Sequence, residues 1–171
     1  YTFGPTWLFP VLEMALLVPL SVSVPVRHAR EPRAHRVSSI ALIAVVNAAN
    51  VASLIRLVDN LLNGGLSGGT QLIFAAMQIW LTNVIVFGLW YWELDRGGPS
   101  DRCKPQHREP DFLFPQMTTP AAAPPNWAPR FLDYLYLSTT NSSAFSPTDT
   151  MPLSNRAKAL MGIQATTALL T

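Results

Sequence analysis

Charged residues and cysteine are scarce in this sequence. Charged residues make up 13% of its 171 residues and hydrophobic residues 49%, whereas roughly a quarter of a typical soluble domain is charged. The single cysteine, Cys103, excludes an internal disulfide and a thiolate metal site. The sequence also lacks a Gly-rich phosphate loop and a nucleophile–base pair at a recognisable spacing. We therefore expect no enzyme, no cofactor and no metal site, and a soluble domain is the less favoured class.

The hydrophobic residues are gathered into long apolar runs. They cover residues 7–26, 37–62 and 70–92, and a fourth run begins near residue 153. About 20 apolar residues in a helix span a hydrocarbon core roughly 30 Å thick. The sequence therefore predicts an all-α, polytopic helical membrane protein with about four transmembrane helices. Because the fourth run stops about half a membrane thickness after Lys158, we expect the natural chain to continue beyond Thr171 and to start before Tyr1.

Arginines are concentrated in the short connection between the first two runs, at Arg27, Arg30, Arg33 and Arg36. Short Arg-rich loops stay on the cytoplasmic side of a membrane. These residues therefore predict the orientation of the chain in a plasma membrane, with residue 1 outside. The net charge of +2 and the pI near 9.0 come from clustered arginines, so we expect the lipid bilayer as a partner and no nucleic acid.

The sequence divides into three regions. Residues 1–92 form a predicted three-helix transmembrane region. Residues 93–129 contain many prolines, which exclude a long helix or a central strand. We expect an extramembrane linker there, with aromatic residues such as Phe112 and Phe114 held along the membrane surface.

Residues 130–171 form the third predicted region, a hairpin. Its first part, 130–137, is aromatic and too short to cross a membrane as a helix, which indicates a re-entrant or interfacial helix. Six side chains with hydroxyl or amide groups follow at 138–143, and we predict a turn there. The last helix then begins near residue 153, with Arg156 and Lys158 in its first turns.

This order of elements resembles the pore module of two-helix potassium channels. It also resembles a family of uncharacterised bacterial multi-pass membrane proteins with the same C-terminal layout. The resemblance covers about the last 100 residues and places the family's Asp at Asp149, its Pro-Leu-Thr-like step at 152–154, and its basic residues at Arg156 and Lys158. It implies a homo-oligomer, a tetramer if channel-like, around a filter-like turn. The residues of that turn are Thr139, Thr140, Ser142, Ser143, Ala144, Phe145, Ser146, Pro147, Thr148 and Asp149.

The filter itself departs from the channel family. Residues 144–148 stand where the family has Thr-Val-Gly-Tyr-Gly, whose backbone carbonyls replace the water around the ion. No glycine is present here, and Pro147 fixes its own φ and restricts Ser146. The sequence therefore predicts a degenerate filter that does not select potassium. A less selective pore would use the hydroxyls of the turn, with Asp149 as a cation-attracting ring.

Two functions fit these observations. The first is a pore-loop cation channel with this degenerate filter. The second is a non-conducting accessory or scaffold subunit of a larger membrane complex. In the channel family the helix before the pore segment runs from inside to outside, whereas the arginine connection orients the run at 70–92 from outside to inside. Asp149 has a second interpretation as the N-terminal cap of the last helix.

Overall fold

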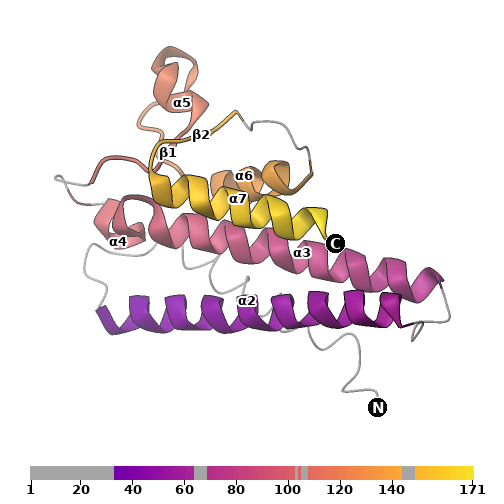
Figure 1. The fold of residues 1–171 in the computed structure, drawn as a ribbon. Coiled ribbons are helices and arrows are strands. Elements are labelled where there is room, and N and C mark those ends of the chain that lie inside the picture. Colours follow the sequence, from indigo (N-terminus) through magenta and orange to yellow (C-terminus); the bar gives the residue numbers. More distant parts are fainter. Residues whose placement is uncertain (1–32, 64–68, 103, 105–107, 144–148) are drawn as a thin grey trace.

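The computed structural model describes residues 33–63, 69–102, 104, 108–143 and 149–171. This part of the chain is mostly helical, which confirms the all-α class (Figure 1). Four helices make up most of it: α2 (Arg33–Leu62), α3 (Gly69–Leu94), α6 (Phe131–Ser143) and α7 (Asn155–Leu169). The shorter elements are η1 (Asp95–Gly97), α4 (Pro99–Arg102), β1 (Phe112–Leu113), α5 (Pro115–Thr118), η2 (Pro120–Ala122) and β2 (Met151–Pro152).

Two helices are long and apolar enough to cross a membrane, judged by length and composition. They span Arg36–Leu62 and Leu72–Gly97, which matches the predicted second and third runs. The predicted first run, 7–26, lies outside the described residues. The 15 residues of α7 extend about 22 Å at 1.5 Å per residue, less than the thickness of a hydrocarbon core. The described residues therefore contain two candidate spans.

Helix α3 lies between α2 on one side and the pair α6 and α7 on the other (Figure 1). Helix α2 runs antiparallel to α3, since its start lies beside the end of α3. A Cβ added to Gly98, just after α3, would lie 3.3 Å from Arg36 Nε in the first turn of α2. Helices α6 and α7 also run antiparallel to α3. Strand β2, which precedes α7, pairs with β1 near the end where α6 begins. The start of α2, the end of α3, the β1–β2 pair and the start of α7 therefore share one end of the molecule.

An aromatic core lies around the second half of α3. The ring of Tyr134 on α6 packs edge-on against Trp92 (5.5 Å between ring centroids), Phe112 (6.3 Å) and Phe114 (5.2 Å). Such edge-on pairs use the opposite charges of ring edge and ring face. Phe112 and Phe114, expected at the membrane surface, are instead buried in this core. Segment 93–129 thus contributes to the packing of the helices and supplies strand β1.

The predicted turn at 138–143 is wrong, because α6 continues through Ser143. Serine and threonine hydroxyls can bond to the carbonyl four residues earlier and so remain compatible with a helix. Thr139 Oγ1 donates to the Leu135 carbonyl (2.8 Å) and Ser142 Oγ to the Ser138 carbonyl (2.9 Å). Thr140 and Ser143 form the same bond, to Tyr136 and Thr139 respectively.

The start of α7 is capped by Ser154, whose side chain accepts the N–H of Ala157 (3.1 Å). A serine in extended backbone geometry at this position satisfies one of the free amides of the first turn. The interpretation of Asp149 as the cap is therefore wrong. Asp149 is exposed and lies before β2.

Candidate functional site

A hydrogen-bond network inside the helical core is centred on Gln164 of α7. Gln164 is fully buried, with an exposed fraction of 0%. Its Oε1 accepts the Tyr91 hydroxyl from α3 (2.5 Å) and the Asn141 amide from α6 (2.9 Å). One side chain of α7 therefore binds both other helices of the core.

The amide nitrogen of Gln164 completes this network. Nε2 lies 3.0 Å from the Ser138 carbonyl, 2.5 Å from Ser138 Oγ and 2.7 Å from Ser142 Oγ, so three acceptors share its two N–H bonds. Ser138 Oγ also donates to the Val84 carbonyl on α3 (2.6 Å). A buried polar network is stabilising when all its members are paired. We define the Gln164 network as Tyr91, Ser138, Asn141, Ser142 and Gln164.

The predicted filter-like residues have different positions. Ser142 belongs to the Gln164 network, whereas Thr139, Thr140 and Ser143 bond to the backbone of α6 itself. Asp149 is exposed. The members at 144–148 lie outside the described residues. The described hydroxyls therefore bond to backbone carbonyls and, at Ser142, also to the Gln164 amide within a single chain.

Gln164 and Tyr91 were missed by the reasoning from sequence. The available signal was an amide within the apolar part of α7 at 159–169, because a polar group there needs a buried partner. The identity of the partners depends on tertiary contacts.

A second polar network closes the end of α3 and is centred on Asp95, which is also fully buried. Its Oδ2 accepts the Tyr134 hydroxyl (2.5 Å) and its Oδ1 the N–H of Asp111 (2.8 Å). Asp111 Oδ2 in turn accepts the N–H of Arg96 (3.0 Å). Asp95 thereby connects α3 to α6 and to the segment that leads into β1.

The turn after Asp95 requires glycine. Arg96, Gly97 and Gly98 have φ values of 54°, 85° and 103°, a region that side chains disfavour and glycine adopts freely. A Cβ on Gly97 would also lie 2.7 Å from Asp101 Oδ2. The tight turn directs the chain from α3 into α4.

Arg102 of α4 covers the same end of α3. Its Nη1 donates to the carbonyls of Trp92 (2.6 Å) and Asp95 (3.0 Å). Its guanidinium group stacks 4.2 Å from the centre of the Trp92 ring, a favourable cation–π geometry. Burial lowers the pKa of Arg102, and the two carbonyls bonded to Nη1 offset part of the lost hydration.

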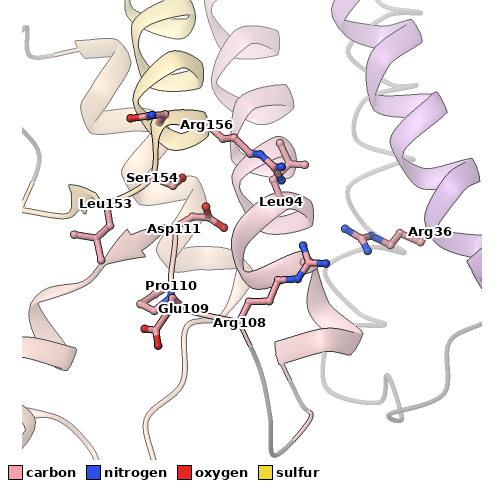
Figure 2. A pocket seen from close by; sticks show the side chains of 11 residues that line it. Arg36, Leu94, Arg108, Glu109, Pro110, Asp111, Leu153, Ser154 and Arg156 are labelled. Carbon is pink, nitrogen blue, oxygen red and sulfur yellow. The ribbon is translucent and has the colours of Figure 1, made fainter.

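A pocket of about 560 Å³ opens beside this end of α3 (Figure 2). It lies between the start of α2, the end of α3, the segment before β1 and the start of α7. We call it the basic pocket. Its lining residues are Arg36, Leu94, Gly97, Arg108, Glu109, Pro110, Asp111, Leu153, Ser154, Asn155 and Arg156.

Of the four arginines predicted to set the orientation, only Arg36 is placed with its side chain. It lines the basic pocket, and its Nη1 lies 3.8 Å from Asp101 Oδ2. Arg33 lies in the first turn of α2, and Arg27 and Arg30 lie outside the described residues. The pocket thus brings one predicted arginine together with two that lie far away in the sequence, Arg108 and Arg156.

Within the described residues, no three histidine, cysteine or acidic side chains gather as a metal would require. No protein-family model, curated protein or solved structure matches this chain. Its function is therefore inferred from the geometry of its own residues.

Proposed function

We propose that this chain is a multi-pass protein of the bacterial plasma membrane and acts as a non-conducting accessory or scaffold subunit of a larger membrane complex. Exposed apolar side chains on the two candidate spans support the membrane location. Val45 and Ile55 on α2 are 65% and 63% exposed, and Phe74 on α3 is 67% exposed. Apolar surface of this extent is unfavourable in water and favourable against lipid or another membrane protein.

The observation that supports a non-conducting role is the Gln164 network. A pore replaces the water around an ion with oxygens that remain available to it. In α6 the hydroxyls of Ser138 and Ser142 are engaged with Gln164, Val84 and the helix backbone. Side chains bonded in this way stabilise the packing of α6 on α3 and α7. They would have to break these bonds to contact an ion.

The charge distribution supports one orientation of this subunit. Arg36, Arg102, Arg108 and Arg156 all belong to the end of the molecule where α2 begins and α3 ends. Under the positive-inside rule this end faces the cytoplasm. Helix α6 would then enter from the cytoplasmic side and the chain would return to that side.

A pore-loop cation channel is the second candidate, and the path of the chain favours it. A short helix, α6, is followed by a return to the starting end and then by α7, parallel to α6 (Figure 1). This is the order of pore helix, return segment and last helix in the module that the sequence resembles. A pore would require several copies around an axis, with the exposed Asp149 near the ions.

Ion flux from purified protein in liposomes distinguishes the two candidates. With potassium, sodium and proton gradients, we expect the flux to equal that of empty liposomes. The mass of the purified particle is measured in detergent alongside. The matched variants are Asp149→Asn and Asp59→Asn, since both remove one exposed carboxylate. Flux from an oligomer that Asp149→Asn lowers, and Asp59→Asn does not, would replace the scaffold with the channel.

A further inference from the structure

The basic pocket collects three arginines from separate parts of the chain. Arg36 comes from the first turns of α2, Arg108 from the segment before β1, and Arg156 from the first turn of α7. Figure 2 shows their guanidinium ends directed toward the same space beside Leu94. Like charges in one cavity repel one another. Their convergence is therefore favourable when an anion occupies the space between them.

The acidic residues that line the pocket, Glu109 and Asp111, offset only part of the positive charge of the three arginines. The Glu109 carboxylate points away from the three guanidinium groups (Figure 2). Asp111 Oδ2 accepts the N–H of Arg96, which holds its carboxylate in place and leaves its charge unchanged. Asp101 pairs with Lys104 as well as lying near Arg36.

Asp101 lies near several positive charges at the edge of the pocket. The hydrogen bond from Lys104 is the largest cause that lowers its pKa, and the positive charges of Lys104, Arg36 and Arg108 lower it further. Lys104, Arg36 and Arg108 therefore all act on the Asp101 carboxylate.

The start of α7 adds a backbone contribution. Ser154, Asn155 and Arg156 line the pocket, so the positive end of the helix dipole lies at its wall. Ser154 holds this first turn in place through its bond to the N–H of Ala157. The pocket thus combines three guanidinium forks with a helix terminus, and both features favour phosphate oxygens.

Size and position agree with a phosphate-bearing ligand. A volume of about 560 Å³ is in the range of small-molecule sites, roughly 300–1,000 Å³. Leu94, Pro110 and Leu153 supply apolar wall for the carbon part of such a ligand. The candidate spans begin at Arg36 and end at Gly97, so in a membrane the pocket would lie at the level of the lipid headgroups.

We propose that the basic pocket binds a phosphate-bearing anion, which is either the headgroup of an anionic lipid or a soluble phosphate ester. Arg36, Arg108 and Arg156 bind the phosphate oxygens, and the first turn of α7 orients these oxygens. Identification of the ligand as a lipid rests on the proposed membrane location, whereas binding of a soluble ester does not depend on that location. Liposome flux has no bearing on this site, so the two proposals fail independently.

Binding to the purified full chain in a neutral detergent tests the site and its ligand source. One arm compares retention of phosphatidylglycerol and phosphatidylcholine by native mass spectrometry. The other titrates glycerol phosphate and inorganic phosphate by calorimetry. We expect saturable binding in one arm and about tenfold weaker binding in Arg156→Gln, since a hydrogen bond to a charged group contributes on this scale. The triple variant Arg36→Gln, Arg108→Gln, Arg156→Gln should lose binding.

Two control variants separate the site from general surface charge. Arg130→Gln removes the same charge from an exposed residue outside the pocket and should leave binding unchanged. Glu109→Gln should leave it unchanged or strengthen it. Absence of saturable binding in both arms would overturn the proposal, and so would an equal loss in Arg130→Gln and Arg156→Gln. If the triple variant aggregates, Arg156→Gln decides, because Arg156 is exposed and its replacement leaves the core intact.

Discussion

The two halves of α3 have similar apolar sequences but different surroundings. In the first half, residues 69–81, Ile73, Phe74 and Met77 are exposed. In the second half, residues 82–94, Phe87 and Tyr91 are buried. Helices α6 and α7 account for the difference, because their aromatic and hydrogen-bonded contacts with α3 fall on its second half.

This difference shows that hydrophobicity alone does not specify where membrane helices meet. Lipid tails are as apolar as leucine, so the burial of an apolar side chain between helices gains little from leaving lipid. Hydrogen bonds and close packing then determine the contacts. The second half of α3 carries the partners for them in Asn83, Tyr91 and the Val84 carbonyl.

The largest expected effect is in the packed half. Phe87 is 2% exposed and its ring contacts Tyr91 at 6.2 Å between centroids. Phe87→Ala should lower the free energy of unfolding by about 2–3 kcal/mol, since it leaves a cavity among residues that relax only partly, while the transfer of the ring to lipid adds little. Unfolding in detergent followed by circular dichroism measures the change. A loss below about 1 kcal/mol would show that the core around α3 is not tightly packed.

A smaller loss is expected when the Gln164 network is interrupted without a change of volume. Gln164→Leu keeps the size of the side chain and removes the acceptor of the Tyr91 hydroxyl. The Asn141 amide loses its bond to Gln164 but keeps its bond to the Met161 carbonyl (3.0 Å). Each buried polar group left unpaired costs about 1–3 kcal/mol, and Ser138 keeps its bond to the Val84 carbonyl. With one group left without its acceptor, we expect a loss of about 1–2 kcal/mol in the same unfolding experiment.

Thr166→Ala is the matched control for this variant. Thr166 is an exposed residue of α7, and its hydroxyl donates to the Gly162 carbonyl within the same helix. Its replacement should change stability by less than about 0.5 kcal/mol. Equal losses in Gln164→Leu and Thr166→Ala would mean that the network does not hold the three helices together.

Local sequence was sufficient for the long helices. Apolar runs at 37–62 and 70–92 predicted α2 and α3 nearly to their ends, because a run of that length satisfies its own backbone in a helix whatever packs against it. The aromatic segment at 130–137 likewise predicted the first part of α6. The hydroxyl run after it was assigned to a turn, since these residues favour turns locally and their bonds along a helix are equally local.

The polar networks were beyond sequence reasoning because their partners are distant in the chain. Tyr91 and Gln164 are 73 positions apart, and Asp95 and Tyr134 are 39 apart. No local pattern identifies such pairs. The same limit applies to the basic pocket, where Arg36 was predicted to set orientation and its proximity to Arg108 and Arg156 became visible only in the fold.

The smallest expected effect is in the exposed half of α3 and tests the comparison most directly. Phe74 is 67% exposed, so Phe74→Ala removes the same ring as Phe87→Ala without opening a cavity. Its side chain contacts the same surroundings before and after unfolding within detergent or lipid, and stability should change by less than about 0.5 kcal/mol. Unfolding of Phe74→Ala and Phe87→Ala side by side gives the difference between the two halves. A loss in Phe74→Ala close to that of Phe87→Ala would mean that another segment or subunit covers this face in solution. The exposed half of α3 would then be a protein interface, and the unequal packing described for its two halves would not hold for the assembled protein.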